Sequence, residues 1–380
     1  MKKCFVFISL LVLASLFFTM VACGQPASTS STTAPVSTTA VSTPTTTTSK
    51  PASTTTPANV IVLSMAPINS GPPPAGGLTV AFSKWADLIQ TRTNGRVKID
   101  IYWAQALAPV NQIVNATSTG IADIGAVAQA QEPGKLPMSM VCQLPGFSTD
   151  FKVQCSAFWD LMNQEPLLSE YTKQNMLPLG VNFVPDYHLI STKQITTAAD
   201  IKGKKIACAG FIAQTIQAMG GVPIAMSPTE QYEGMQKGTI DGDCAPYSAI
   251  NDFKFYEVAK YISDFNFGGR IQPILVNKDS WNKLPADIQK IFIDSIPDFV
   301  QFNYEAVLGK GEPMFPITDK MIQDNKLQFT KIANSEHAIV EKIQAGQADA
   351  WAAEQEKAGI QANKLLADYR GLIAKYTNAK

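Results

Sequence analysis

Cys208 and His188 are the residues whose types could carry out catalysis. Cys208 lies in the run Lys204–Phe211, KKIACAGF. A cysteine nucleophile needs a basic partner that holds it as the thiolate, and His188 could take that part. The sequence offers no context for an oxyanion hole or a third catalytic group, whereas a cysteine among alanines is typical of a small buried strand residue. We therefore expect a structural thiol and no enzyme activity.

The acidic and glycine-rich segments do not predict a cofactor. Asp241-Gly242-Asp243 resembles the start of a calcium loop, but Asp252 stands at the twelfth place, where that loop carries a glutamate. We expect these acids instead to end a strand and to cap the helix that follows. The glycines near Cys208 are Gly203, Gly210, Gly220 and Gly221. Their spacing does not fit the phosphate-binding loop or the dinucleotide-binding motif.

The N-terminus resembles a bacterial lipoprotein signal peptide at residues 1–22. A basic start precedes the apolar segment Cys4–Met20, and Met20-Val21-Ala22-Cys23 resembles the lipobox at which lipid is attached to Cys23. An ordinary signal peptide is the alternative. Residues 23–58 are almost entirely Ser, Thr, Pro and Ala, so we expect a solvated tether. The protein is therefore expected outside the cytoplasmic membrane (periplasm or cell surface) and anchored to it by lipid.

The remaining cysteines are expected to meet an oxidising compartment. Without Cys4 and Cys23 they are Cys142, Cys155, Cys208 and Cys244. They allow three disulfide pairings, among which the sequence does not choose. No spacing among them is of a metal-binding kind, and the chain has only two histidines, so no metal site is expected.

The bulk composition fits a globular protein of about two domains. The chain has 380 residues, of which 46% are hydrophobic, and 31 basic residues balance 31 acidic ones. Because no long-range field of one sign exists, nucleic acid is not an expected partner.

Strand and helix patterns alternate from Val60 onward. Ser227-Pro228-Thr229-Glu230 is a capping box that predicts a helix from Pro228 to Lys237. Pro285 opens another helix, and Glu336–Tyr376 should form one long or broken helix. Strands are expected at 60–65, 97–103 and 121–128, with helices between them. This alternation predicts an α/β architecture with largely parallel sheets.

An ordered set of motifs resembles the solute-binding protein of tripartite ATP-independent periplasmic (TRAP) transporters, the C4-dicarboxylate-binding (DctP-type) family. Residues 200–206 read Asp-Ile-Lys-Gly-Lys-Lys-Ile, close to the family's Asp-Leu-Lys-Gly-Lys-Lys-Ile. Further matches, in the family's order, are Thr93–Ile99, Gly120–Gly125, Leu144–Phe147, Glu230, Tyr232, Gln236, Gly238, Asp241, Gly242 and Asn277–Pro285. Any one of these motifs is weak, but the ordered set is specific.

The resemblance implies a two-domain periplasmic-binding-protein fold of the type II-like kind, with mixed sheets flanked by helices, a ligand cleft between the domains and a long C-terminal helix. We expect domain I at 59–185 plus 272–310 and domain II at 186–271. Residues 311–380 should pack across both. The chain is expected to cross at 186–193 and to return at 270–277.

The family pattern breaks at Ala207. The resemblance implies an arginine at that place, which would clamp a ligand carboxylate with its planar fork. A buried carboxylate without a charge partner is strongly disfavoured. Either the ligand is therefore neutral, aromatic or a bulky acid, or Arg270 or His188 compensates.

Several residues near expected strand ends are predicted to bind the ligand. They are Asn69, Trp103, Gln129, Tyr187, His188, Ala207, Phe211, Tyr247, Asn251 and Arg270. The small residues of Ala207–Ala209 should enlarge the pocket, and the aromatic residues should line it. The resemblance implies a receptor that delivers a small organic solute to integral membrane permease subunits. A lipoprotein hydrolase and a surface-binding lipoprotein without a transport role are the alternatives.

Overall fold

The computed structural model describes residues 60–68, 71, 77–132, 134–147, 150–184, 186–308 and 323–379. The expected signal peptide, lipid-bearing Cys23, the tether and Asn69 lie outside these residues. Within the described ranges, no helix is both long and apolar enough to span a bilayer. All described residues belong to one compact unit.

The first sheet, sheet A, has the strand order β2-β1-β3-β10-β4. Its strands are β1 (Ile61–Ala66), β2 (Val97–Ile101), β3 (Ile124–Ala126), β4 (Met176–Val184) and β10 (Arg270–Asn277). Strand β1 pairs in parallel with β2 and β3, whereas β10 is antiparallel to β3 and β4. In β2 Val97 and Ile99 are buried and Lys98 is exposed, which is the alternation of a strand with one covered face.

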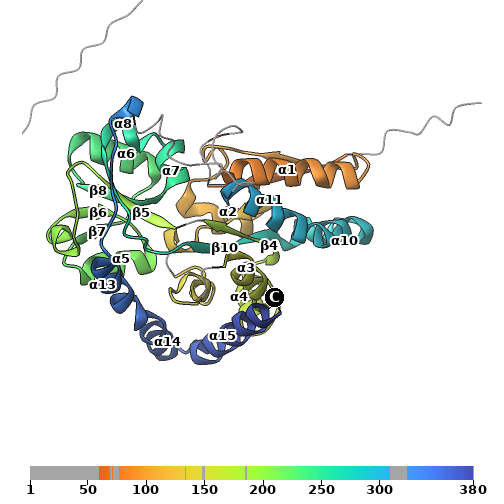
Figure 1. The fold of residues 1–380 in the computed structure, drawn as a ribbon. Coiled ribbons are helices and arrows are strands. Elements are labelled where there is room, and N and C mark those ends of the chain that lie inside the picture. Colours follow the sequence, from red (N-terminus) through yellow and green to blue (C-terminus); the bar gives the residue numbers. More distant parts are fainter. Residues whose placement is uncertain are drawn as a thin grey trace, which may run out of the picture. The chain divides into compact units, whose positions relative to one another are not determined.

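Helices cover both faces of sheet A (Figure 1). One face carries α1 (Gly77–Arg92), α10 (Ala286–Asp294) and α11 (Ile296–Leu308), and the other carries α3 (Phe151–Met162) and α4 (Leu167–Thr172). On the first face, the Trp85 indole lies edge-on to Phe292 with ring centroids 5.8 Å apart. Its Nε1 donates to Ser295 Oγ at 2.8 Å. On the second face, Phe183 of β4 stacks on Phe151 with centroids 4.3 Å apart.

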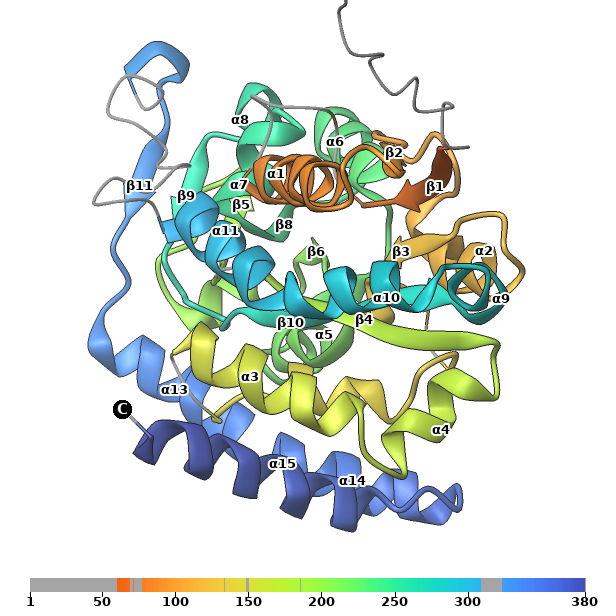
Figure 2. The same cartoon turned by 90° about the vertical axis from the view of Figure 1, so that its right-hand side faces the viewer.

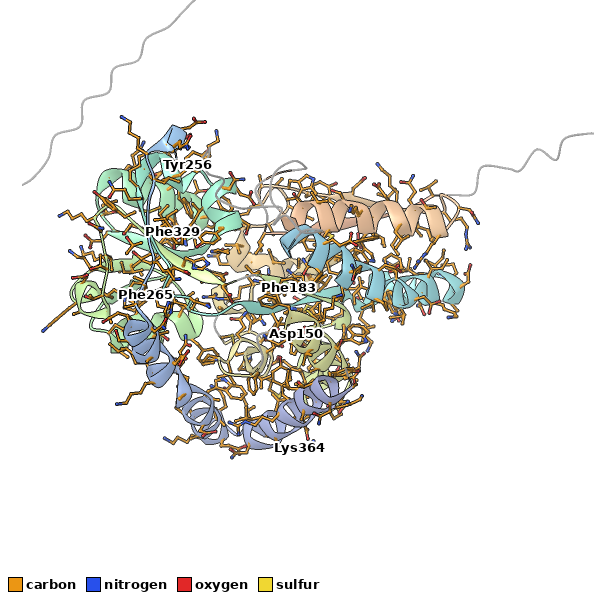
Figure 3. All side chains as sticks on the ribbon, in the orientation of Figure 1. Asp150, Phe183, Tyr256, Phe265, Phe329 and Lys364 are labelled. Carbon is orange, nitrogen blue, oxygen red and sulfur yellow. The ribbon has the colours of Figure 1, made fainter. Side chains whose placement is uncertain are left out.

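The second sheet, sheet B, has the order β11-β9-β5-β8-β6-β7. Its strands are β5 (Tyr187–Ser191), β6 (Lys205–Ala207), β7 (Val222–Ile224), β8 (Gly242–Pro246), β9 (Tyr261–Ser263) and β11 (Gln328–Thr330). Strand β6 is parallel to β7 and β8, and β5 is antiparallel to β8 and β9. Figure 3 marks Phe265 in this part of the molecule, in a different core from Phe183 of sheet A.

Helices also cover sheet B on both faces. One face carries α6 (Pro228–Lys237), α7 (Tyr247–Asp252) and α8 (Phe255–Val258), and the other carries α5 (Gly210–Ala218). The predicted capping box of α6 is confirmed, because the Ser227 and Glu230 side chains each accept from the other's backbone N–H. Gly238 then ends α6 at φ 70°, a conformation that glycine adopts without strain.

Short helices and turns make the remaining connections. They are η1 (Val110–Gln112), α2 (Ile113–Ser118), η2 (Gln129–Gln131), η3 (Ser139–Gln143), η4 (Ala198–Ile201) and α9 (Lys278–Asn282).

The chain passes between the sheets three times among the described strands, the third time between β10 of sheet A and β11 of sheet B. Strand β4 of sheet A ends at Val184 and β5 of sheet B begins at Tyr187; β9 of sheet B ends at Ser263 and β10 of sheet A begins at Arg270. Because β10 returns beside the outgoing β4, these two strands must be antiparallel. The expectation of largely parallel sheets is therefore wrong for the crossing strands, and the mixed sheets are confirmed. The exact domain bounds stay a prediction.

The C-terminal segment contacts helices of both sheets. It continues from β11 into α13 (Asn334–Ala345), α14 (Gln347–Lys357) and α15 (Ala362–Asn378). Helix α13 packs against α5, and α15 packs against α3 and α14, as Figure 2 shows for the last pair. The long helix expected at Glu336–Tyr376 is thus broken into three.

Candidate functional site

A cavity lies between the two sheets, at the ends of several strands. Sheet A contributes residues that follow β1 and β3, and sheet B contributes β5, β8 and the residues that follow β6. The cavity has a volume of about 120 Å³, measured as the space open to the centre of a water-sized sphere. The polar and aromatic residues that line it are Gln131, Tyr187, Cys208, Gln231, Asp243, Cys244, Ser248, Asp252, Phe253, Arg270 and Gln272. The volume suits a small organic molecule rather than a few waters.

Arg270 is the first residue of β10 and only 8% exposed. Its Nη2 donates to the carbonyl of Ala209 at 2.9 Å, and its guanidinium carbon lies 4.4 Å from the centroid of the Tyr187 ring. A guanidinium has five N–H donors. Ala209 O is its only hydrogen-bond acceptor among the described residues, so the guanidinium keeps donors for a ligand.

Asp243 of β8 is the second charged group of the cavity, and it is 1% exposed. Within the described ranges, no donor bonds its Oδ1. Burial raises the pKa of this carboxyl to about 8, although the positive charge of Arg270 acts in the opposite direction. The carboxyl is therefore mostly protonated at neutral pH in the free protein.

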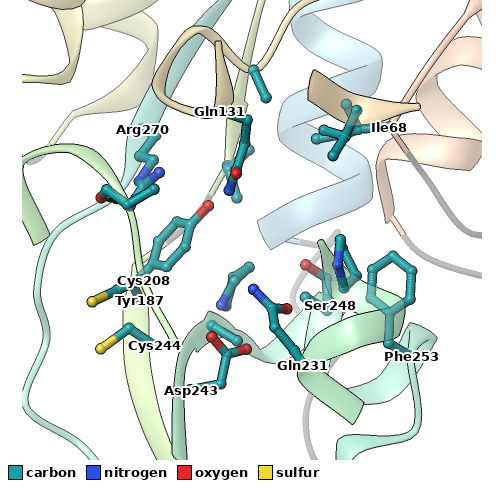
Figure 4. Close-up of a pocket in the computed structure, with 18 of the residues that line it drawn as sticks. Ile68, Gln131, Tyr187, Cys208, Gln231, Asp243, Cys244, Ser248, Phe253 and Arg270 are labelled. Carbon is teal, nitrogen blue, oxygen red and sulfur yellow. Dashed lines mark hydrogen bonds between the residues drawn. The ribbon is translucent and has the colours of Figure 1, made fainter. Parts of the chain in front are cut away.

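Arg270 and Asp243 approach the cavity from different sides. Figure 4 shows Arg270 with Gln131 on one side and Asp243 with Gln231 on the other. The described residues show no ion pair between the two, since the Arg270 guanidinium is bonded to Ala209 and stacked on Tyr187. The cavity thus presents a cation and a carboxyl separately.

Two of the ten predicted ligand-binding residues, Tyr187 and Arg270, line this cavity. His188 follows Tyr187 on β5 and points to the opposite face of the strand. Its Nδ1 lies 2.8 Å from Asp264 Oδ1, and its ring stacks on Tyr247 with centroids 4.0 Å apart. His188 and Tyr247 are therefore brought together, but neither lines the cavity.

The other predicted residues occupy varied places outside the cavity lining. Ala207 is fully buried in the core formed with Met235 and Ile240, while its neighbours Cys208 and Ala209 line the cavity. Gln129 is buried, and its Nε2 donates to the carbonyls of Ser139 and Ile271. The remaining residues are Trp103, half-buried against the sheet A core, and Asn251, on α7.

Phe211 lines a smaller hollow beside the main cavity. This hollow has a volume of about 30 Å³, measured in the same way as the main cavity. Arg270 lines both the hollow and the main cavity. Phe211 also packs into the core that contains α3 and α15. Whether Phe211 and the residues outside the cavity contact ligand stays a prediction.

Asp243 was missed by sequence reasoning. The expectation that Asp241 and Asp243 end a strand is wrong, because β8 begins at Gly242 and Asp243 lies within it. A side chain at Gly242 would place its Cβ 2.6 Å from the Ile190 carbonyl oxygen, so only glycine allows β8 to pair this closely with β5. The signal was available: an acid directly after a strand-starting glycine, followed by Cys244-Ala245-Pro246 without a polar side chain.

Comparisons with known proteins agree with this architecture. Residues 78–354 match the family model described as bacterial extracellular solute-binding protein, family 7. An uncharacterized protein of Sinorhizobium fredii is 25% identical over 227 residues, which are 59% of this chain but only 42% of that protein. A solute-binding protein of Verminephrobacter eiseniae is 26% identical over 228 residues, 59% of this chain and 68% of that one.

A solved structure shares the fold over nearly its whole length. It is a TRAP solute-binding protein from Rhodoferax ferrireducens in complex with copurified benzoate. The TM-score is 0.74 at 23% identity, and the match covers 84% of this chain and 99% of that one.

Proposed function

Because this chain belongs to family 7 of the bacterial extracellular solute-binding proteins, the receptors of TRAP transporters, we propose that it captures a small carboxylate-bearing solute in the cavity between its sheets. The captured solute would pass to the integral membrane subunits of a TRAP permease. The family and fold are those of receptors rather than enzymes. We propose no catalytic step for the chain itself.

The observation that carries this proposal is the buried Arg270 in the cavity. A guanidinium binds a carboxylate through two parallel N–H bonds, and burial strengthens such bonds. Arg270 would take over the role of the arginine that the family resemblance implies at the position of Ala207. The benzoate in the structurally similar R. ferrireducens protein is one carboxylate of suitable size.

Arg270 is a stronger candidate for this role than His188. The His188 ring is engaged by Asp264 and Tyr247 and lies outside the cavity lining. Arg270 lies in the lining and is held in place by Ala209 and Tyr187. Its cation is therefore already oriented before ligand arrives.

A ligand screen by thermal unfolding tests the proposal. A ligand at about 100 times its Kd stabilises the folded state by about 2.7 kcal/mol, so carboxylates that bind should raise the Tm of the purified protein. Arg270→Gln should weaken their binding at least about 30-fold, because a buried charge partner is lost. Arg96→Gln is the matched control, since Arg96 pairs with Asp287 at the surface. No carboxylate response, or an unchanged response in Arg270→Gln, would contradict the proposal.

We also propose that the chain is held at the outer side of the cytoplasmic membrane by lipid on Cys23, with residues 23–58 as the tether. The lipobox resemblance and the composition of that segment support this. Cys23→Ser should move the protein from the membrane fraction to the soluble extracytoplasmic fraction. An unchanged membrane fraction would contradict the anchor without affecting the ligand proposal.

The hydrolase alternative has a direct test. Cys208 and Cys244 are both lining residues of the cavity, and burial raises the pKa of the Cys244 thiol well above its usual value, which disfavours a thiolate. We therefore expect that alkylation of Cys208 removes no hydrolytic activity from the protein. Loss of hydrolysis of any substrate on alkylation of Cys208 would support the enzyme instead.

A further inference from the structure

Carboxyl groups outnumber cationic side chains among the described residues that line the cavity. Arg270 is the one cationic side chain among the described lining residues, whereas Asp243 and Asp252 both carry carboxyl groups. A cavity built for a simple anion would be expected to surround it with cations and neutral donors. A second carboxylate on the ligand would instead meet carboxyl groups.

The Asp243 carboxyl lacks, on its Oδ1, the hydrogen-bond donor that buried polar atoms normally have among the described residues. It is almost completely buried, its Oδ1 has no donor among the described residues, and it faces the cavity (Figure 4). Buried polar atoms without a partner are uncommon and costly, and in a binding cavity the missing donor can come from the ligand.

Among the described residues, no cation forms an ion pair with Asp243. The titratable and charged groups that share the cavity come from several elements, and none except Arg270 is basic. They are Tyr187 of β5, Cys208 after β6, Cys244 of β8, Asp252 of α7 and Arg270 of β10. Arg270 itself is bonded to Ala209 O and stacked on Tyr187.

We propose that the cavity recognises a zwitterion, with the ligand carboxylate on the Arg270 guanidinium and a ligand ammonium on the Asp243 carboxylate. The ligand class is thus that of a small amino acid. This inference rests on the proposed receptor function and names its ligand. A zwitterion offers its carboxylate to Arg270 and its ammonium to Asp243, and this ammonium supplies the donor that Asp243 Oδ1 lacks.

Binding of such a ligand has a proton signature. In the free receptor the Asp243 carboxyl holds a proton at pH 7, because burial raises its pKa to about 8. The arriving ammonium keeps its own proton, and the Asp243 O–H bond breaks to give the carboxylate and a proton that goes to the buffer. Up to one proton is therefore released for each zwitterion bound, with no other bond made or broken.

Isothermal titration calorimetry at pH 7 tests the inference on the purified chain. The probes are α-, β- and γ-amino acids, each paired with the hydroxy acid of the same skeleton and with the amine that lacks the carboxylate. We expect at least one amino acid to bind about 100-fold or more tightly than its hydroxy acid, since a site that hydrogen-bonds a specific group rejects analogues without it. Titrations in phosphate and in Tris should give different heats, corresponding to proton release.

Asp243→Asn should weaken binding of the amino acid about 100-fold, change the affinity for the hydroxy acid by less than about 3-fold, and remove the buffer-dependent heat. Asp294→Asn is the matched control, because Asp294 pairs with Lys290 at the exposed end of α10. If Asp243→Asn does not fold, the wild-type comparison still decides, since an amino acid that binds no more tightly than its hydroxy acid would show that Asp243 contacts no ammonium.

The outcomes separate the two proposals. If only carboxylates without an ammonium bind, and their binding needs Arg270, the zwitterion inference is overturned and the receptor proposal stands. If no carboxylate of either class binds, the receptor proposal itself fails. Equal binding of amino acid and hydroxy acid without proton release also overturns the zwitterion inference.

Discussion

Two buried carboxyl groups of this chain, those of Glu170 and Asp243, differ in the hydrogen bonds that they accept. Glu170 of α4 accepts from Met138 N, Ser139 N and Ser139 Oγ at 2.6, 2.9 and 2.6 Å. Asp243 of the cavity has no donor for its Oδ1 among the described residues. Burial raises the pKa of both, to about 7 for Glu170, where these bonds oppose the rise, and to about 8 for Asp243. The fold satisfies the carboxyl that joins its own elements and leaves the other for a ligand.

The largest effect expected from this comparison is on the unliganded protein. Asp243 has a folded pKa above its unfolded value of about 3.8, so its contribution to stability is complete below about pH 4 and is lost as pH rises through about 8. Asp243→Asn removes this loss. We expect the variant to be more stable than wild type by about 3 kcal/mol at pH 9, and the difference to shrink as pH falls. Denaturant unfolding at pH 5, 7 and 9 measures it.

A constant difference between Asp243→Asn and wild type over that pH range would show that the carboxyl is satisfied in the free protein. Glu170 contributes its own fall in stability between about pH 4.5 and 7. That contribution is present in both proteins and cancels in the comparison.

The next effect should have the opposite sign. Glu170→Gln places an amide N–H₂ among backbone and hydroxyl donors, so buried donors lose an acceptor. We expect destabilisation by about 2 kcal/mol with an unchanged Kd for any ligand of the cavity. Unfolding and calorimetry on the same sample check both parts. A changed Kd would indicate that η3 and α4 communicate with the cavity.

The smallest effect concerns the carboxyl of Asp264, which follows β9 and is paired with His188. His188 lowers the pKa of Asp264, so this pair stabilises the fold above about pH 4 and is lost as pH falls further. Because Asp264 is a third exposed, Asp264→Asn should cost no more than about 1 kcal/mol at pH 7 and progressively less as pH falls below about 4. A larger loss, measured by denaturant unfolding, would mean that the His188–Tyr247 stack depends on this pair.

The sequence could predict the elements whose signals are local. The Ser227–Glu230 capping box and Gly238 fixed α6 at both ends, and the alternation around Val97 predicted β2. The family motifs predicted two lobes with mixed sheets. These features depend on residues close together in the chain, so the periodicity and capping rules apply directly.

The details of the site depend on contacts that periodicity does not encode. In a strand, one residue of register decides which face a side chain takes. Ala207 therefore lies in the core while Cys208 lines the cavity. The sequence offered both Arg270 and His188 as candidates for the ligand carboxylate. Only the tertiary structure shows that Arg270 lines the cavity between the sheets whereas His188 does not. The glycine and acid at the start of β8 were visible in the sequence, but the close approach of β8 to Ile190, which requires Gly242, is a tertiary contact.

The most direct test of the central claim is a crystal structure of the protein with a bound ligand from the calorimetric panel. We expect the ligand carboxylate on the Arg270 guanidinium at about 2.8 Å, with a nitrogen donor of the same ligand on Asp243. A ligand whose carboxylate does not touch Arg270, or one that binds outside the cavity between the sheets, would contradict it.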